Sequence, residues 1–279
     1  MIDSVDGYKE LANQVKMPGF GYGCYKAVGD ELVNAIIVAL NTGYRLIDTA
    51  EFYHNEDTVG EAIKKSGFKR ENIFVVSKIW PSSFENAVSV LDNSLKLLQL
   101  DYLDAYLLHW PGLNGKARYH AWEKLLREVE KGKIRVLGVS NFLEHHLEEL
   151  HKNFDHWPLV NQIEVHPDFQ EIDLCNFCKK RSIAIMSWSP LGRGNVLNQS
   201  VLEEIGKTFG KTPAQIALRW QVQMDYVPVP KSVHADRIRE NANIFDFKLS
   251  DEQMAVIHGL NLPNDEGKIG KNADEWPLD

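Results

Sequence analysis

Four polar side chains of this 279-residue chain stand at or just beyond the ends of apolar, strand-like runs. The run that begins at Leu46 ends in Asp48, and Tyr53 follows five residues later within the stretch YRLIDTAEFYHNE. Lys78 comes near the end of NIFVVSKIW, and His109 near the end of DAYLLHWP. A carboxylate, a phenol, an amine and an imidazole are together suited to delivering a proton to a carbonyl oxygen.

Tyr53 is the expected proton donor of this set. A phenol has a reference pKa of about 10, which is too high for easy donation and return near neutral pH, and a nearby ammonium is expected to lower it. Lys78 would supply that ammonium. Asp48 would fix and partly balance Lys78, because a buried charge is costly unless it is paired. His109 would hold the substrate oxygen or help to relay the proton.

Each of these residues also has a structural interpretation when it is taken alone. Asp48 could cap the next helix, and Tyr53 could pack a loop. A lone lysine at a strand end is usually solvated, and a lone histidine before Trp-Pro is usually a satisfied loop residue. The proton-transfer hypothesis therefore depends on the recurrence of polar residues at the ends of several apolar runs.

The repeated unit of the chain is a short apolar run, a polar loop and an amphipathic helical stretch such as Phe84–Gln99. Eight runs alternating with helices predict an α/β fold, a closed (β/α)8 TIM barrel that forms a single domain over residues 1–279. A short N-terminal hairpin within Tyr8–Val15 and a C-terminal loop would complete it. The runs are Phe20–Gly23, Arg45–Asp48, Ile73–Lys78, Leu103–His109, Ile134–Ser140, Leu159–Glu164, Ile183–Ser187 and Tyr226–Val229.

The competing arrangement is an open, doubly wound sheet, which usually carries G-x-G-x-x-G in its first turn. After Gly21 and Gly23 the position of the third glycine holds Lys26, so the barrel is favoured. In a barrel the C-terminal ends of the strands face the active site. The further residues found at these ends are Ser140, Asn141, Gln162, Trp188, Ser189, Lys231 and Ser232.

The sequence contains no nucleophile and base at the spacing of a hydrolytic triad, and no H-x-H strand end for a metal-dependent barrel hydrolase. No metal is expected. The proposed acid therefore serves a reaction in which another group supplies the electrons.

Composition and charge narrow the range of partners. The net charge of −8 and the pI near 5.7 argue against nucleic acid and anionic membranes as general partners. Cys24, Cys175 and Cys178 are an odd, sparse set that indicates a reducing compartment, and the C-x-x-C of the last two is expected to be structural. No signal peptide and no run of about 18 apolar residues is visible, so the protein is expected in the cytoplasm. It is also expected to be a monomer.

From Met17 to about Gly270 the chain resembles the aldo-keto reductase family. The resemblance is carried by LIDTAEFYHNE, VVSKIW, LLHWP, GVSNF, NQIEVHP, SWSPLG and PKSVHADRIREN, in the family's order and spacing. It implies an NADPH-dependent reductase of aldehydes and ketones, closest to the bacterial reductases of glyoxal, methylglyoxal and diketogluconate. It also implies that Asp48, Tyr53, Lys78 and His109 form the catalytic tetrad.

The resemblance implies a complete NADP(H) site as well. Ser140, Asn141 and Gln162 would contact the nicotinamide amide, and Trp188, where the family usually has tyrosine, would stack on the ring. The segment Leu191–Asn195 resembles the loop that folds over the pyrophosphate. The residues expected to bind the cofactor are Ser140, Asn141, Gln162, Trp188, Ser189, Leu191, Lys231, Ser232, Val233, Arg237, Glu240 and Asn241.

The adenosine end of that site can also be interpreted physically. Lys231, Ser232 and Arg237 place positive charge and a hydroxyl beside a helix that starts near Ala235, and helix N-termini attract anions. A 2′-phosphate would suit this position, whereas the alternative is a solvated basic turn. Cys24 replaces the family's usual small polar residue after the first strand.

Tyr25, Trp80 and Trp110 are expected to line the substrate pocket, because each lies just past a strand end. His54 could be a pocket residue or solvated. The polar tail after Asp251–Leu260 is short, so little chain is expected to cover the pocket. The expected substrates are small activated aldehydes and α-dicarbonyls, with keto-sugars as a further option. A non-catalytic nucleotide-binding scaffold is the alternative function.

Overall fold

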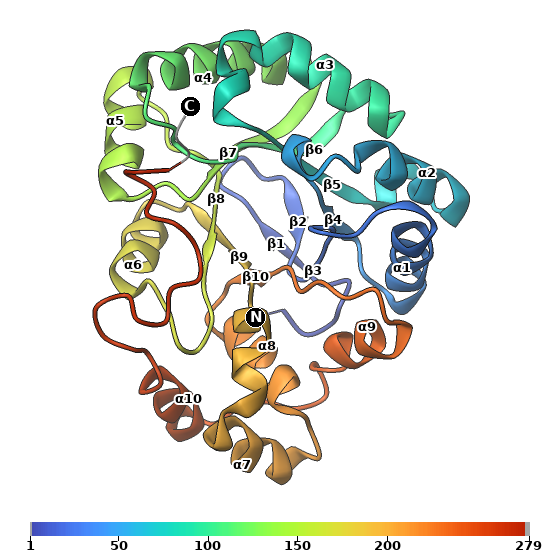
Figure 1. Ribbon diagram of the computed structural model, residues 1–279, viewed down its shortest axis with the longest axis vertical. Helices are drawn as coiled ribbons and strands as arrows, with labels where there is room; N and C mark the ends of the chain where they lie inside the picture. Colours follow the sequence, from blue (N-terminus) through green and yellow to red (C-terminus); the bar gives the residue numbers. More distant parts are fainter. Residues whose placement is uncertain (1, 277–279) are drawn as a thin grey trace.

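Eight parallel strands run in chain order around the computed structural model, which describes residues 2–276, and helices surround them (Figure 1). Each neighbouring pair is parallel, with Asp48 opposite Val76 and Lys78 opposite Leu107 as examples of the register. This confirms the predicted (β/α)8 barrel. The strands are β3 Gly21–Gly23, β4 Leu46–Asp48, β5 Phe74–Ile79, β6 Leu103–Leu108, β7 Ile134–Ser140, β8 Val160–Glu164, β9 Ala184–Trp188 and β10 Val227–Pro228.

The first and last strands meet through the segment that follows β10. The amide of Gly23 donates a hydrogen bond of 3.1 Å to the carbonyl oxygen of Pro230. A Cβ on Gly23 would lie 2.9 Å from the carbonyl oxygen of Val229, so only glycine permits this approach. Pro228 and Pro230 have no amide hydrogen to donate, which explains why β10 is shorter than the expected Tyr226–Val229.

The interior of the barrel is a packed apolar cluster that includes Leu46, Val76 and Leu107. The end of the barrel at which the strands begin is closed by an antiparallel hairpin of β1 Tyr8–Glu10 and β2 Lys16–Pro18. Leu11 and Met17 of this hairpin belong to the same buried cluster. The hairpin was expected at this place, although its second strand lies beyond Tyr8–Val15.

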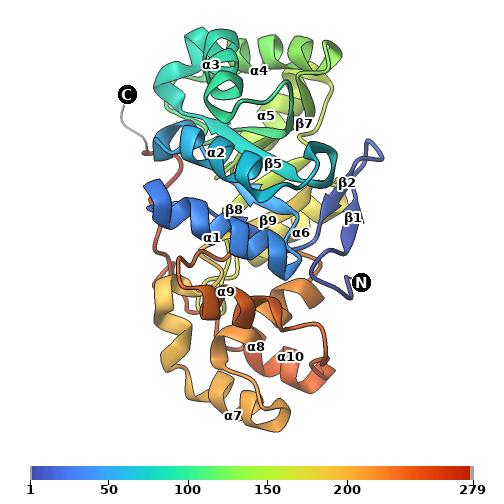
Figure 2. The same ribbon diagram turned by 90° about the vertical axis from the view of Figure 1, so that its right-hand side faces the viewer.

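The hairpin and the C-terminal tail lie at opposite ends of the barrel (Figure 2). The tail follows the last helix, and Figure 1 shows its red trace running past α6 towards α5. The tail is therefore on the same side as the C-terminal ends of the strands.

The expected helical stretch Phe84–Gln99 is divided into a 3-10 turn, η3 Pro81–Asn86, and helix α3 Ala87–Leu98. No helix within residues 2–276 combines the length and apolar character that crossing a membrane requires. The remaining helices are α1 Gly29–Thr42, α2 Glu56–Ser66, α4 Gly115–Glu130, α5 Glu144–Phe154, α6 Ile172–Lys180, α7 Ser200–Phe209, α8 Pro213–Gln223, α9 Ala235–Ala242 and α10 Asp251–His258, with 3-10 turns η1 Glu51–Tyr53, η2 Arg70–Asn72 and η4 Gly192–Asn198.

Candidate active site

A cavity of about 930 Å³ opens at the C-terminal ends of the strands. Every residue expected in the site lines it except Lys78, which is fully buried behind the wall. Its volume lies near the upper end of the range of about 300–1,000 Å³ that small-ligand pockets span. The expected residues in its wall are Tyr25, Asp48, Tyr53, Trp80, His109, Trp110, Ser140, Asn141, Gln162, Trp188, Ser189, Leu191, Lys231, Ser232, Val233, Arg237, Glu240 and Asn241.

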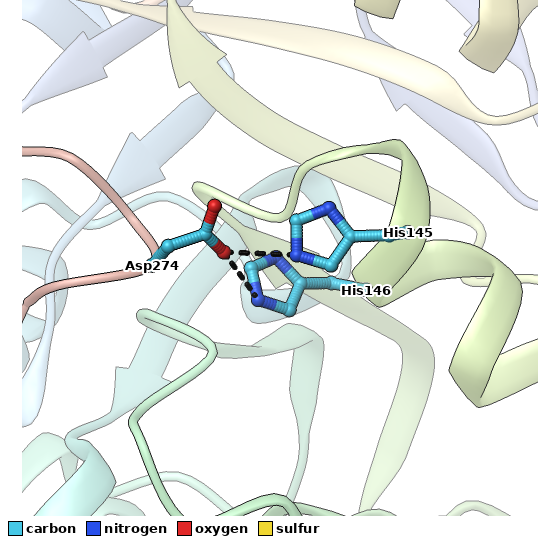
Figure 3. A group of neighbouring side chains, drawn as sticks. All are labelled: His145, His146 and Asp274. Carbon is cyan, nitrogen blue, oxygen red and sulfur yellow. Dashed lines mark hydrogen bonds and ion pairs between the residues drawn. The ribbon is translucent and has the colours of Figure 1, made fainter.

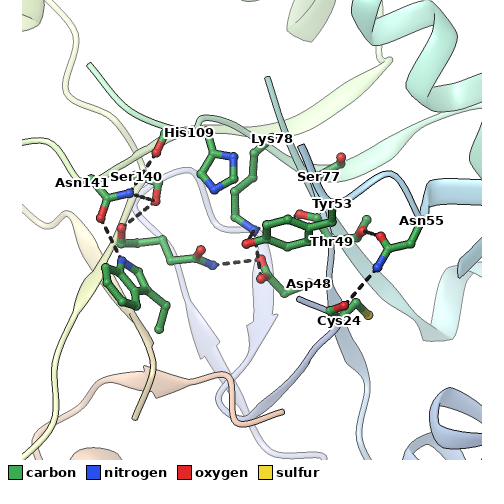
Figure 4. A network of polar contacts seen from close by, with 12 residues as sticks. Cys24, Asp48, Thr49, Tyr53, Asn55, Ser77, Lys78, His109, Ser140 and Asn141 are labelled. Carbon is green, nitrogen blue, oxygen red and sulfur yellow. Dashed lines mark hydrogen bonds and ion pairs between the residues drawn. The ribbon is translucent and has the colours of Figure 1, made fainter. Parts of the chain in front are cut away.

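Lys78 joins the acid and the phenol of the set (Figure 4). Its Nζ lies 2.9 Å from Oδ2 of Asp48, 2.8 Å from the carbonyl oxygen of Thr49 and 3.3 Å from the hydroxyl oxygen of Tyr53. The other carboxylate oxygen of Asp48 accepts a 2.9 Å hydrogen bond from Nε2 of Gln162. The buried ammonium therefore has the partner that the sequence predicted, and both carboxylate oxygens are engaged.

The pKa of Tyr53 is shifted in the direction opposite to the expected one. Burial raises it well above its ordinary value, and Asp48, Cys24 and Tyr25 add to the rise. The expected lowering by Lys78 is wrong because the charge of that ammonium is already balanced by Asp48. Burial also lowers the pKa of Lys78, whereas Asp48 opposes this change. Tyr53 is thus a phenol that keeps its proton near neutral pH.

His109 faces the same end of the cavity. Burial, together with the charge of Lys78, lowers its pKa well below 6.5, so its imidazole is neutral near neutral pH. Its ring lies edge-on to Tyr53 and Trp80, with centroid distances of 5.5 and 5.2 Å. Its Nδ1 is buried and has no hydrogen-bond partner among the described residues. A neutral imidazole can present one N–H to a carbonyl oxygen.

The polar residues at the ends of β7, β8 and β9 form a connected chain. Ser140 donates to the carbonyl oxygen of Gln162 at 2.8 Å, and Nδ2 of Asn141 donates to the carbonyl oxygen of His109 at 2.9 Å. The indole N–H of Trp188 donates to Oδ1 of Asn141 at 2.8 Å. The indole ring therefore has a fixed orientation in the cavity wall, as a stacking platform requires.

The opposite end of the cavity is basic. Lys231, Ser232 and Arg237 lie in the wall at the start of α9. The Ser232 hydroxyl accepts a hydrogen bond of 3.1 Å from the amide of His234. Within residues 2–276 neither Lys231 nor Arg237 takes part in an ion pair, so both cations are available to an anion. These donors fit a phosphate group.

Three aromatic residues border the catalytic end, as expected. Trp80 stacks on Phe52 with a centroid distance of 4.1 Å, and Tyr25 packs against Tyr53 at 5.0 Å. Phe52 also lines the cavity but was missed, although it precedes Tyr53 in the sequence. His54 is exposed and lies outside the wall.

The thiol of Cys24 is buried, and burial raises its pKa. It does not line the cavity, although Gly23 and Tyr25 on either side of it do. The carbonyl oxygen of Cys24 instead accepts a 3.0 Å hydrogen bond from the buried amide of Asn55. Cys175 and Cys178 are also buried and free, in agreement with a structural role.

The C-terminal tail contributes more of the wall than the sequence indicated. Both carboxylate oxygens of Glu164 are 2.7 Å from tail amides, those of Ile269 and Gly270. The expectation that little chain covers the pocket is therefore wrong. The wall residues missed in the tail are Ile269, Gly270, Lys271 and Trp276, and those missed elsewhere include Lys26 and His234. Arg193 also lines the wall, within the loop Leu191–Asn195 that the resemblance indicated.

Comparison with known proteins places this geometry among characterised relatives. The model of the "Aldo/keto reductase family" matches residues 23–262. A glyoxal reductase of Bacillus subtilis is 46% identical over 270 residues, which cover 95% of this chain and 96% of the relative. A methylglyoxal reductase of Escherichia coli K12 is 39% identical over 263 residues, with coverages of 93% and 94%. A mutant of Gox0644 crystallised in complex with NADPH has a TM-score of 0.93 and 32% identity over 98% of this chain and 99% of that structure.

Proposed function

The chain belongs to the aldo/keto reductase family, and from this premise we propose that it reduces small α-dicarbonyls and activated aldehydes, with Tyr53 as the proton donor. Family membership makes it an NADPH-dependent oxidoreductase of carbonyl compounds. The observation that carries the proposed mechanism is the buried Asp48–Lys78 pair, whose ammonium lies 3.3 Å from the Tyr53 hydroxyl in the cavity wall.

The residues of this cluster have separate proposed roles. Tyr53 keeps its proton until a substrate oxygen beside it gains negative charge, and it then donates that proton. His109 is neutral and holds the carbonyl oxygen through its N–H. Lys78 faces the phenolate that forms and stabilises it electrostatically, and Asp48 keeps Lys78 in position.

The cavity wall offers a binding surface for NADP(H), which supplies the hydride when it is bound. Ser140, Asn141 and Gln162 would hold the nicotinamide amide beside Trp188. Lys231, Ser232 and Arg237 would hold the 2′-phosphate. The remaining proposed contacts come from Ser189, Leu191, Val233, Glu240 and Asn241, all of which line the same cavity.

The proposed substrate class rests on the names of two relatives and on the wall chemistry. The relatives are reductases of glyoxal and of methylglyoxal. The wall at the catalytic end consists mainly of Tyr25, Phe52, Trp80 and Trp110. Apolar walls discriminate weakly, because one methylene is worth only about 1–3 kcal/mol. Intrinsic reactivity would then rank the substrates, and α-dicarbonyls accept hydride readily.

The experiment that tests the proton donor is the substitution Tyr53→Phe. It removes the hydroxyl and leaves the ring that packs against Tyr25 and His109. Turnover of methylglyoxal, followed by NADPH oxidation, should fall by at least about a hundredfold, the usual scale of general acid catalysis. The dissociation constant of NADPH, measured by tryptophan fluorescence, should stay unchanged. Near-normal turnover in the variant would rule out Tyr53 as the acid.

The substrate class is tested by ranking kcat/KM for methylglyoxal, a nitrobenzaldehyde and a steroid ketone at one NADPH concentration. Methylglyoxal should rank first and the steroid last. The tail residues Ile269, Gly270, Lys271 and Trp276 line the same cavity, so a bulky ligand would have to fit beside them. A steroid in first place would contradict the proposed class without touching the role of Tyr53.

We further propose that the chain acts as a single domain and a monomer in the cytoplasm, without nucleic-acid partners. The three free cysteines support a reducing compartment such as the cytoplasm, and the net charge of −8 argues against nucleic acid as a partner. Light scattering coupled to size-exclusion chromatography would test the oligomeric state, and a mass near twice 31.8 kDa would contradict it.

A further inference from the structure

A cluster of metal-ligating side chains lies outside the reductase site, where the C-terminal tail meets helix α5 (Figure 3). His145 and His146 are the second and third residues of that helix, and Asp274 belongs to the tail. One ligand atom from each residue lies within 4.8 Å of the others. We propose that these three residues bind one Zn²⁺ ion, which fastens the tail to α5.

The distances suit a zinc ion with small adjustments. Oδ1 of Asp274 is 2.8 Å from Nε2 of His145 and 3.3 Å from Nε2 of His146. Ligands about 2.0–2.1 Å from a tetrahedral zinc ion are separated by about 3.3–3.4 Å. The two histidine nitrogens therefore need to move away from the carboxylate oxygen by at most about half an ångström, and they already lie within 4.8 Å of each other. A water molecule would complete the four-coordinate set.

Asp274 is held in place by contacts that do not involve the histidines. Its amide donates to Oδ1 of Asn272 at 3.1 Å, and the side chain of Asn272 reaches Glu275 at 3.1 Å. Ala273 beside it is 5% exposed, and Ile269 further up the tail is bound by Glu164. The carboxylate is thus presented to α5 by a tail segment that is itself anchored.

The two histidines contribute in different ways. The side chain of His146 is 7% exposed, and its ring lies 4.0 Å, centroid to centroid, from the ring of His145. The side chains of His145 and Asp274 are 53% and 48% exposed, which leaves a path for an ion and for water. Two imidazoles and one carboxylate favour Zn²⁺ over Mg²⁺ or Ca²⁺.

Two features oppose the ion and limit its affinity. Nδ1 of His146 accepts a long hydrogen bond of 3.3 Å from the amide of Leu143, and coordination through Nε2 would place the ring proton on Nδ1. The Leu143 N–H would then face a ring N–H and lack an acceptor, which costs about 1–3 kcal/mol and reduces affinity by about 5- to 150-fold. Arg118 lies near His146, but its guanidinium is paired with Glu149 at 2.8 Å. A moderately tight site is therefore expected.

The test is titration of the tag-free, full-length protein with Zn²⁺ by calorimetry and with Co²⁺ by visible absorption. One equivalent should bind, and Co²⁺ should give the spectrum of a four-coordinate ion. Asp274→Asn keeps an oxygen that accepts from the histidines but removes the anionic ligand. This variant and His145→Ala should each lose at least about tenfold in affinity, since even changes around metal ligands cost 10–100-fold.

The matched control is His156→Ala, which removes an exposed histidine outside the cluster. It should bind Zn²⁺ like the parent. Hydrogen–deuterium exchange should show Zn²⁺ protecting the tail peptide in the parent and in this control, but not in Asp274→Asn. Equal Zn²⁺ binding by the parent and Asp274→Asn, or none in the parent at 100 times the protein concentration, would overturn the proposal. None of these readouts requires reductase activity.

Discussion

Tyr53 illustrates how burial and a balanced neighbouring charge together set the pKa of a single residue. Lys78 is 3.3 Å away, but Asp48 already balances it, and burial keeps the phenol protonated. The residue types were predicted from the sequence because each follows an apolar run. The direction of the pKa shift could not be predicted from the sequence, because it depends on how far the folded barrel shields Tyr53 from water.

The rate of reduction should therefore depend little on pH between about 6.5 and 9. The donor is the protonated form of Tyr53, which is present below its raised pKa and is lost only as the pH rises through that value. His109 has a lowered pKa and stays neutral throughout this range. The measurement is kcat/KM for methylglyoxal against pH at saturating NADPH and constant ionic strength.

Alcohol oxidation provides the control for this profile. The reverse reaction needs the phenolate of Tyr53 as a base, so its rate should rise with pH over the same range. A loss of reduction with a midpoint below pH 9 would mean that Lys78 does lower the pKa of Tyr53.

At the scale of elements, the strands were easier to predict than the tail. Asp48 and Lys78 lie on neighbouring parallel strands, so their apolar runs sufficed to bring them together. The tail contacts Glu164 through the amides of Ile269 and Gly270, which are 105 and 106 residues away. Backbone amides carry no sequence signal. The buried Glu164 at the end of β8 could have indicated a partner there.

The contact between the tail and β9 can be tested at Gly270. A Cβ at this position would lie 2.8 Å from the Trp188 ring and 2.8 Å from Oε2 of Glu164. Both neighbours are fixed by hydrogen bonds, so Gly270→Ala should displace the indole from its place in the wall. An aromatic stacking contact contributes about 0.5–1.5 kcal/mol, so NADPH should bind about two to ten times more weakly.

The control for this variant is Gly115→Ala at the start of α4, where an added Cβ meets no atom nearer than 3.5 Å. Fluorescence titration with NADPH should give the parent dissociation constant for Gly115→Ala and a larger one for Gly270→Ala. Parent-like affinity in both variants would show that the tail does not position Trp188.

At the scale of the molecule, closure of the barrel and the basic end of the cavity depend on one segment. The amide of Gly23 binds the carbonyl oxygen of Pro230, and the hydroxyl of Tyr22 donates to the carbonyl oxygen of Ser232 at 2.6 Å. Lys231 lies between these two contacts. The alternation of runs and helices predicted a barrel. It did not indicate that the seam and the proposed phosphate site share residues, because that depends on which side chains follow the last strand into the cavity.

Cofactor binding should consequently stabilise the whole barrel, and NADPH should do so more than NADH. A ligand at 100 times its dissociation constant adds about 2.7 kcal/mol to the free energy of unfolding, and each kcal/mol raises Tm by about 2–4 °C in a chain of this size class.

A charge-assisted hydrogen bond to the 2′-phosphate contributes about 1.5–3 kcal/mol. Arg237→Ala should therefore bring the Tm increase from NADPH close to that from NADH. Arg239→Ala, an exposed residue of the same helix that pairs with Asp236 outside the cavity wall, should leave the difference intact. Thermal unfolding at equal cofactor concentrations measures both. Equal increases from NADPH and NADH in the parent protein would remove the basis for a phosphate site at Lys231, Ser232 and Arg237.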